Sequence, residues 1–249
     1  MVDIAEMTSP EVGEAIQNGY DTVVFAVGSN EQHGPCLTVS TDTILGDVLA
    51  LGVAKKLGKA LKAPTIRVGC SEHHMTFPGT ITLRKETLQE LLRDYVSSIG
   101  RHGFKRIIVL PSHGGNFEPL AEVSGELQEM SPGVKVIVYT DLLEFVDILM
   151  KTSDGFRVSR EDAGAHAGEA EVSMMMYANP EGVREEFIPE ARGYVGAFDE
   201  EATRKIFADG IAVLSRIGVL GDPKEASREH GEKYIEDLIE AIVDHINSK

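Results

Sequence analysis

Residues 23–42 read VVFAVGSNEQHGPCLTVSTD, and this stretch decides the fold. Its first five residues form an unbroken apolar run rich in valine, which is typical of a strand buried on both faces of a parallel sheet. An amphipathic stretch then begins at Asp42, and its apolar spacing predicts a helix over 42–61. A strand followed by a helix is the repeating unit of an α/β fold.

The same alternation continues along the rest of the chain. Further apolar runs predict strands over 65–68, 107–110 and 134–139. Amphipathic periodicity predicts helices over 85–102, 117–130, 142–150, 169–177, 200–217 and 224–246. No linker rich in proline, glycine and serine interrupts this pattern. We therefore predict a single domain over 1–249, built as a three-layer α/β/α sandwich around a mostly parallel central sheet.

Charge and composition exclude several classes of function. The chain of 249 residues has 24 Lys+Arg against 40 Asp+Glu, a formal net charge of −16, whereas binding to nucleic acid or to an anionic membrane requires a basic face. The N-terminal stretch has neither a basic segment nor an apolar segment of a signal peptide. Cys36 and Cys70 form no redox or zinc motif, which favours a reducing compartment. We expect a cytoplasmic protein with a small-molecule substrate, and no nucleic-acid or membrane partner.

Histidines gather where the predicted strands end. Ligands of parallel sheets bind beyond the carboxyl ends of the strands, and six of the eight histidines lie in or near those segments: His33, His73, His74, His102, His113 and His166. In an extended chain, Glu31 and His33 point the same way, and Asp42 follows where the chain turns into a helix. Glu, His and Asp suit zinc, manganese or iron(II). The alternative is that Glu31 and His33 are solvated loop residues and that Asp42 caps the helix.

Two more segments offer histidines at strand ends. Leu110-Pro-Ser-His-Gly-Gly-Asn116 follows a buried strand, and its glycines allow the backbone near His113 to approach a ligand closely. The alternative is an ordinary loop histidine, with Asn116 capping the following helix. His73 and His74 precede a Phe-Pro-Gly turn, and either a substrate-facing or a structural role is open for them.

The segment AGAHAGEAEVS, residues 163–173, carries the remaining candidates. If its helix starts near His166, then His166 and Glu169 share a face, because they are three residues apart, and Glu171 points elsewhere. A His/Glu pair at that spacing recurs in dinuclear carboxylate sites. One such pair is weak evidence, but three polar groups at three strand ends indicate a site.

Five segments, in order along the chain, resemble the motifs of the creatininase (creatinine amidohydrolase) superfamily. They are GSNEQHGP…STDT, EHHMTFPGTITL, SHGGN, HAGEAEVS and GDPKEAS, and the resemblance runs from Gly28 to about Ser227. It implies a creatininase-like α/β/α fold around a mononuclear or dinuclear metal site. It also implies assembly into a compact homo-oligomer, often a hexamer.

By motif position, the resemblance implies four ligands for two divalent cations (Zn²⁺, Mn²⁺ or Fe²⁺): Glu31, His33, Asp42 and His113. Asp42 takes the bridging position. Creatininase has a glutamate two residues after the last of these histidines, and this chain has Gly115 there. The resemblance implies that Glu169 supplies the missing ligand, with Glu171 as the alternative. It also implies that His166 is the catalytic histidine, with Glu169 beside it among the catalytic residues.

The resemblance implies hydrolysis by a metal-activated water, with protonation of the leaving group by the catalytic histidine. Creatininase clamps creatinine with tryptophans, whereas this chain has no Trp, which disfavours creatinine. We therefore expect a metal-dependent hydrolase of a cyclic amide, formamide or related small carbonyl compound, acting on a non-peptide C–N bond. Two alternatives stay open. One is a hydrolase that opens an oxidised cyclitol ring at a C–C bond, and the other is a non-catalytic, metal-binding member of the fold.

Overall fold

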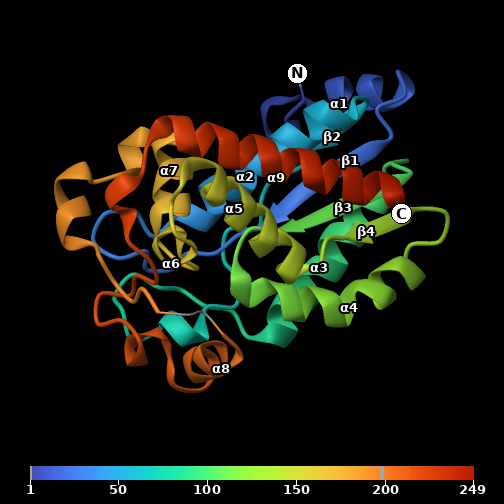
Figure 1. Cartoon of the computed structure of the whole chain (residues 1–249). Helices are drawn as coiled ribbons and strands as arrows, with labels where there is room; N and C mark the ends of the chain where they lie inside the picture. Colours follow the sequence, from blue (N-terminus) through green and yellow to red (C-terminus); the bar gives the residue numbers. More distant parts are fainter. Residues whose placement is uncertain (1, 197–198) are drawn as a thin grey trace.

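A computed structural model describes residues 2–196 and 199–249 (Figure 1). Within these residues, the centre of the molecule is a four-stranded parallel sheet with the strand order β2-β1-β3-β4. The strands are β1 (Thr22–Val27), β2 (Ala60–Lys62), β3 (Arg106–Pro111) and β4 (Lys135–Val138). β1 and β3 pair along their whole length, from Thr22 opposite Arg106 to Val27 opposite Pro111.

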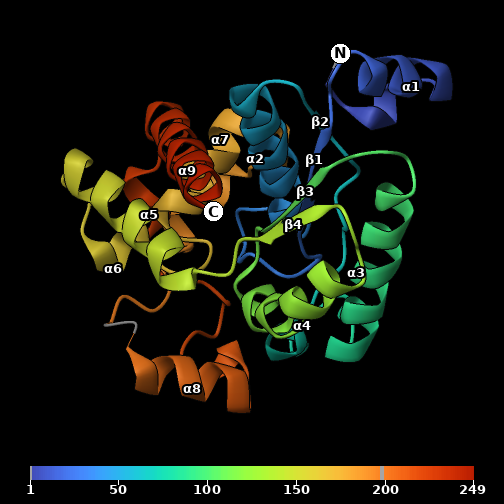
Figure 2. The same ribbon diagram turned by 90° about the vertical axis from the view of Figure 1, so that its right-hand side faces the viewer.

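Helices cover both faces of this sheet (Figure 2). On one face lie α3 (Lys85–Gly100) and α4 (Phe117–Glu129), and on the other lie α2 (Thr41–Leu57) and α9 (Arg228–Ser248). Alternate residues of β1 serve the two layers: Phe25 packs in one core with the leucines of α3 and α4, and Val24 packs in another with residues of α2 and α9. All six residues of β1 are buried, which explains its unbroken apolar run. The predicted three-layer fold is confirmed.

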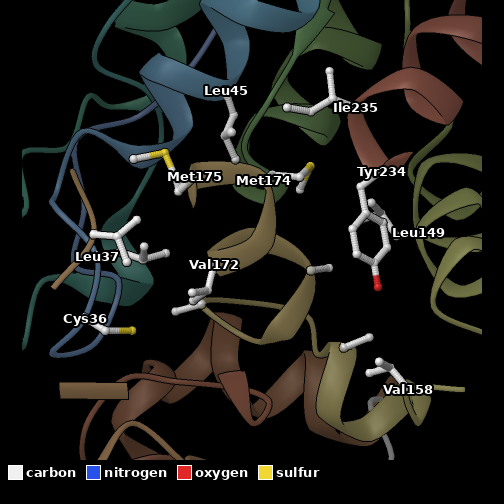
Figure 3. Close-up of a cluster of buried hydrophobic side chains, with 14 of the residues drawn as sticks. Cys36, Leu37, Leu45, Leu149, Val158, Val172, Met174, Met175, Tyr234 and Ile235 are labelled. Carbon is white, nitrogen blue, oxygen red and sulfur yellow. The ribbon is translucent and has the colours of Figure 1, made fainter. Parts of the chain in front are cut away.

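A further core joins the helices on the α2 side. There α5 (Leu142–Phe156) and α7 (Glu169–Ala178) pack against α9. Figure 3 shows Leu45 of α2 beside Met174 and Met175 of α7, with Ile235 and Tyr234 of α9 on the side of Met174. This packing fixes the start of α7 beside the carboxyl edge of the sheet, where the functional groups lie.

The remaining helices lie at the margins of the sandwich. They are α1 (Ser9–Gln17), α6 (Arg160–Ala163) and α8 (Glu200–Asp209). In Figure 1, α8 lies apart from the sheet, and it packs against the short 3-10 turn Glu72–His74. Among the described residues, no helix is both long and apolar enough to cross a membrane.

Several predicted boundaries were wrong for local reasons. The helix predicted over 42–61 ends at Leu57, because Gly58 adopts a positive φ of 64°, and the chain then forms β2. The predicted strand over 65–68 is reduced to a single bridge between Ile66 and Val27. The helix predicted over 200–217 ends at Asp209, before Gly210 with a φ of 87°.

The strand order locates the ligand-binding edge. β1 connects through α2 to β2 on one side, whereas β3 pairs with β1 on the other side. The chain therefore reverses its direction of winding between β1 and β3, and open α/β sheets bind ligands at the carboxyl ends of the strands at such a point.

Candidate metal centre

The candidate centre is a cluster of five side chains: Glu31, His33, Asp42, His113 and Glu171. The segment that follows β1 supplies the first two of them. Glu31 and His33 are buried, with 0% and 1% of their surface exposed. Nδ1 of His33 donates a hydrogen bond to the backbone oxygen of Glu31 at 3.1 Å, so Nε2 of the same ring faces the cluster. Oε2 of Glu31 accepts from the hydroxyl of Ser29 at 3.1 Å, which leaves Oε1 directed into the cluster.

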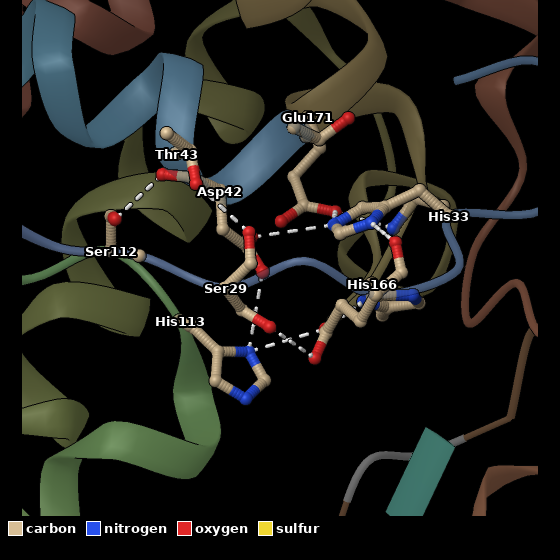
Figure 4. A network of polar contacts seen from close by, with 12 residues as sticks. Ser29, His33, Asp42, Thr43, Ser112, His113, His166 and Glu171 are labelled. Carbon is tan, nitrogen blue, oxygen red and sulfur yellow. Dashed lines mark hydrogen bonds and ion pairs between the residues drawn. The ribbon is translucent and has the colours of Figure 1, made fainter. Parts of the chain in front are cut away.

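Asp42 lies between two histidines (Figure 4). It is the second residue of α2, and Ser40 occupies the N-cap position, so the interpretation of Asp42 as the cap is wrong. Its Oδ1 lies 3.3 Å from Nε2 of His33, and its Oδ2 lies 3.4 Å from Nδ1 of His113. A carboxylate whose two oxygens face different imidazoles has the geometry of a bridging ligand.

His113 follows β3 directly and points across the sheet edge toward the β1 segment. Its Nε2 donates to the backbone oxygen of Cys70 at 3.0 Å. Its Nδ1 therefore faces inward, 3.2 Å from Oε1 of Glu31. His33 and His113 thus direct different ring nitrogens into the cluster. In each ring, the other nitrogen donates to a backbone oxygen, and this hydrogen bond determines which nitrogen faces inward.

The sequence does not predict the role of Asn116, for which it offers helix capping as one alternative. Its side chain makes no capping hydrogen bond. Instead its Nδ2 donates to the backbone oxygens of Val27 and Gly28, both at 3.0 Å, and its Oδ1 accepts from the N–H of Cys70. A Cβ at Gly69 would lie 2.3 Å from that Oδ1. Asn116 therefore ties together three loops that carry the cluster.

The start of α7 corrects the prediction for Glu169. The helix begins at Glu169, as the predicted range 169–177 has it, so the condition of a start near His166 is not met. The two glutamates of its first turn contact different groups. Oε2 of Glu171 lies 3.8 Å from Nε2 of His33, whereas both oxygens of Glu169 are occupied elsewhere. Glu169 accepts hydrogen bonds from the Ser173 hydroxyl, the Tyr234 hydroxyl and Nδ1 of His230, at 2.8, 2.7 and 2.7 Å. The structure thus places Glu171, and not Glu169, beside the cluster.

Gly115 explains why the last acidic group comes from another element. A Cβ at this position would lie 2.2 Å from the backbone oxygen of Cys70 and 2.6 Å from Nε2 of His113. No side chain fits there without moving that backbone. The acidic side chain beside His33 is instead that of Glu171, in the first turn of α7.

Two further histidines border the same space. Nδ1 of His166 lies 3.7 Å from Oε1 of Glu31, and Nε2 of the buried His74 lies 3.4 Å from the same oxygen. The ring of His73 packs against that of Phe207 in α8, with 4.6 Å between the centroids. His102 is exposed at the end of α3 and takes no part.

Hydrogen bonding inside the cluster is incomplete. Among the described residues, four buried side-chain nitrogen or oxygen atoms lack a hydrogen-bond partner, and three of these are Oε1 of Glu31, Nε2 of His33 and Oδ2 of Asp42. Buried polar atoms are nearly always satisfied by protein, water or an ion. Three unsatisfied atoms that face one space therefore point to a missing ligand.

The spacing of the inward-facing atoms fits cations. Among the described residues they form three groups, each within 4.8 Å, and two of these share Asp42: Glu31 with Asp42 and His113, and His33 with Asp42 and Glu171. The third group is Glu31, His33 and His166. A tetrahedral cation with bonds of about 2.0–2.1 Å holds its ligands about 3.3 Å apart. The separations of 3.2–3.4 Å between imidazole nitrogens and the carboxylates of Glu31 and Asp42 agree with this value.

The electrostatics of the cluster lead to the same conclusion. Burial opposes a charge on His33, but the carboxylate of Asp42 outweighs this effect and raises the pKa of His33 to about 10. Against the same effect of burial, Glu31 raises the pKa of His113 to about 9, and His113 in turn holds the pKa of Glu31 well below its ordinary value. Burial, with the neighbouring His33, lowers the pKa of His166 to about 4. Without a cation, protons occupy the positions that a cation would take.

The fold and the cluster together define the class: an α/β/α protein with a candidate dinuclear metal centre at the carboxyl edge of its sheet. The family model described as "Creatininase: Creatinine amidohydrolase" matches residues 5–246, and the chain belongs to this family. It is an amidohydrolase.

Individual relatives agree with this assignment. A mycofactocin precursor peptide peptidase from Mycolicibacterium smegmatis is 30% identical over 229 residues, which cover 90% of this chain and 83% of the relative. A crystal structure of creatinine amidohydrolase (creatininase) superimposes with a TM-score of 0.79 and 25% identity, over 99% of this chain and 97% of that chain. A structure described as creatininase with Mn superimposes with a TM-score of 0.75 and 25% identity, over 99% and 98%.

Proposed function

We propose that this enzyme hydrolyses an amide C–N bond of a small molecule with two divalent cations per chain. One cation would be held by Glu31, Asp42 and His113, and the other by His33, Asp42 and Glu171. The three unsatisfied buried atoms of Glu31, His33 and Asp42 carry this proposal, because a cation is the simplest ligand that satisfies all of them. Zn²⁺ and Mn²⁺ both suit this donor set, and so does Fe²⁺.

The protein side of the centre is preorganised. His33 and His113 each use one ring nitrogen to donate to a backbone carbonyl, which fixes the ring and leaves the other nitrogen facing the cluster. When bound, divalent cations supply a Lewis acid for a carbonyl oxygen and make a water acidic enough to ionise near neutral pH. The carboxylates of Glu31, Asp42 and Glu171 would offset most of the positive charge of two such cations.

His166 is the proposed proton carrier. It is neutral near pH 7 because burial lowers its pKa to about 4, and its Nδ1 faces the cluster. In that position Nδ1 would accept a proton from the attacking water and deliver it to the amide nitrogen as the C–N bond breaks, so that this nitrogen leaves as an amine. A low pKa favours the second half of this transfer, because the imidazolium gives up its proton readily. The other product is a carboxylate.

The substrate is proposed to be a cyclic amide or a formamide other than creatinine. The chain has no Trp to clamp a flat ring. The aromatic group next to the cluster is instead the pair formed by His73 and Phe207 of α8, and Phe207 is 55% exposed. A second candidate is a peptide bond, which is favoured by the 30% identity to the mycofactocin precursor peptide peptidase.

A combined metal analysis and substrate screen tests this proposal. The protein is loaded with Zn²⁺ or Mn²⁺, its metal content is measured, and lactams, formamides and short peptides are supplied as substrates. We expect about two metal ions per chain and release of an amine from one of these classes. The His113→Ala variant is expected to lose metal and activity, whereas His102→Ala, at an exposed position in the turn after α3, keeps both. A folded wild-type protein that takes up neither metal would refute the proposed centre.

A further inference from the structure

Gln32 stands between the proposed ligands Glu31 and His33 in the sequence. Its side chain contacts a different set of groups. It is 5% exposed. Its Oε1 accepts from the N–H of Gly34 at 2.9 Å, and its Nε2 donates to the backbone oxygen of Gly218 at 3.1 Å. A backbone N–H only donates and a backbone oxygen only accepts, so these two contacts fix the orientation of the amide.

The backbone of Gln32 determines the tautomer of His166. Nε2 of His166 lies 2.8 Å from the backbone oxygen of Gln32. Because that oxygen only accepts, Nε2 of His166 must carry the proton. In the neutral ring, Nδ1 then holds a lone pair, and this is the nitrogen that faces the cluster.

The side chain of Gln32 determines the tautomer of His74 by elimination. Nε2 of Gln32 carries two hydrogens, and one of them is donated to the backbone oxygen of Gly218. The second has two possible targets, Nε2 of His166 at 3.0 Å and Nδ1 of His74 at 2.9 Å. Nε2 of His166 already carries a proton and cannot accept a hydrogen bond. The amide therefore donates to Nδ1 of His74, which places the proton of that ring on Nε2, 3.4 Å from Oε1 of Glu31.

The surrounding chain is shaped to hold this amide. Gly218 has a positive φ of 77°, and a Cβ at that position would lie 2.0 Å from Oε1 of Gln32. The N–H of Gln32 also donates to the hydroxyl of Thr80 at 3.1 Å. These contacts hold the amide in one place between the two imidazoles.

We propose that Gln32 is a positioning residue that sets the tautomers of both histidines beside the metal centre. It makes His166 present a lone pair at Nδ1 to the cluster, and it makes His74 present an N–H at Nε2 to Glu31. The importance of this arrangement for catalysis rests on the function proposed above. The tautomers themselves do not, so they can be tested separately.

The direct test is a long-range ¹H–¹⁵N correlation spectrum of the full-length, zinc-loaded protein labelled with ¹⁵N-histidine. The signals are assigned with the single variants His74→Asn and His166→Asn. In the wild type, we expect both rings as the Nε2–H tautomer. In Gln32→Glu, which has nearly the same shape but no amide hydrogen, we expect His74 to move its proton to Nδ1 while zinc content is retained.

Gln128→Glu is the matched control. The amide of Gln128 also bridges a backbone N–H and a backbone oxygen, those of Val136 and Val134, but on the surface at α4. We expect this variant to keep both tautomers. If Gln32→Glu does not fold, Gln32→Met removes the donor without adding charge, and His74 should then show an averaged tautomer signal. An Nδ1–H tautomer of His74 in the wild type, or unchanged tautomers in a folded Gln32 variant, would overturn the proposal.

Activity gives a second readout once a substrate is known. In Gln32→Glu, we expect kcat to fall about 10–100-fold, the range typical of groups that orient metal-site residues, with KM little changed. Loss of the tautomer pattern without loss of kcat would refute the link to catalysis and leave the hydrolase assignment intact. Failure to find any substrate would leave the tautomer result valid.

Discussion

At the scale of single residues, the centre depends on which atom of each side chain faces inward. His33 uses Nε2 and His113 uses Nδ1, because backbone oxygens of Glu31 and Cys70 hold their other nitrogens. The residue types and their places after strands could be predicted from the sequence. The choice of nitrogen could not, because the carbonyl that meets His113 is 43 residues away along the chain.

The two glutamates at the start of α7 give the first prediction. Glu171→Gln is expected to reduce metal content from about two ions per chain to about one, because an amide is a poor substitute for a carboxylate ligand. Glu169→Gln is expected to retain both ions but to lower the free energy of unfolding by about 1–3 kcal/mol, because three donors around the buried carboxylate lose a charged acceptor. Metal analysis and urea unfolding measure the two effects. If Glu169→Gln loses one ion and Glu171→Gln does not, the ligand assignment is wrong.

The imidazoles give a prediction about pH. In the metal-free protein, the pKa values of His33 and His113 are about 10 and about 9, above the ordinary 6.5 of the unfolded chain. Both rings are therefore protonated at pH 7, and both must lose a proton to bind a cation. We expect release of about two protons per chain on saturation with Zn²⁺ at pH 7, and tighter binding as the pH rises.

Calorimetric titration in two buffers of different ionisation enthalpy measures this release. A His102→Asn control, which changes a histidine outside the cluster, should release the same number of protons as the wild type. His113→Asn should release fewer. Binding of two ions with no proton release would contradict the proposed roles of both imidazoles.

At the scale of whole elements, the sequence predicts three strands and the start of α7 at Glu169, but not where the first turn of α7 lies relative to the sheet. The apolar runs at 23–27, 107–110 and 134–139 correspond to β1, β3 and β4. The central strands β1 and β3 are buried on both faces and are apolar for that reason, whereas β4 is an edge strand in which only Ile137 is buried. The placement of that first turn depends on tertiary contacts. His166 bridges to Leu220, and Ala167 adopts a positive φ of 52° before the helix begins. His166 therefore lies outside the helix, while Glu171 lies beside the cluster and Glu169 contacts Tyr234.

The contact between α7 and α9 provides a prediction at this scale. A Cβ at Gly231 of α9 would lie 1.8 Å from the backbone oxygen of Ser173 in α7, so the two helices cross at a point where only glycine fits. Gly231→Ala should lower the free energy of unfolding by about 1–3 kcal/mol through overpacking. The control is Gly125→Ala in α4, where the added Cβ has no neighbour within 4 Å. This variant should raise the free energy of unfolding by about 0.5–1 kcal/mol. Chemical unfolding of both variants is the measurement, and a stabilised Gly231→Ala would contradict the close crossing.

At the scale of the whole molecule, the resemblance to the creatininase superfamily predicts a homo-oligomer. The first turns of α5 carry neighbouring exposed apolar side chains, including Leu143 at 82% exposure, with Leu142 and Val146 at 36% each. Exposed apolar patches of this kind often mark interfaces between proteins. Light scattering coupled to size-exclusion chromatography should give a mass that is a multiple of 27.0 kDa, and six copies are expected. A mass of one chain at micromolar concentration would contradict the prediction.

Metal removal should destabilise the entire fold, because the proposed ligands come from four places in it: the segments after β1 and β3 and the first turns of α2 and α7. A cation that binds the folded chain at a thousandfold excess over its Kd stabilises it by about 4 kcal/mol. For a chain of this size, about 2–4 °C of Tm per kcal/mol corresponds to a fall of about 8–16 °C after chelation.

The fall in Tm after chelation should depend on pH, and the pKa values of His33 and His113 determine whether it grows or shrinks as the pH rises. Protons on His33 and His113 stabilise the metal-free protein fully below pH 6.5, and this contribution is lost as the pH rises through about 9 and 10. The difference in Tm between the metal-loaded and metal-free protein should therefore be larger at pH 9 than at pH 6.5. Thermal unfolding followed by circular dichroism tests this in wild type and in His113→Ala, whose Tm should respond little to a chelator. An equal or smaller difference at the higher pH would show that protons and cations do not compete for the same cluster.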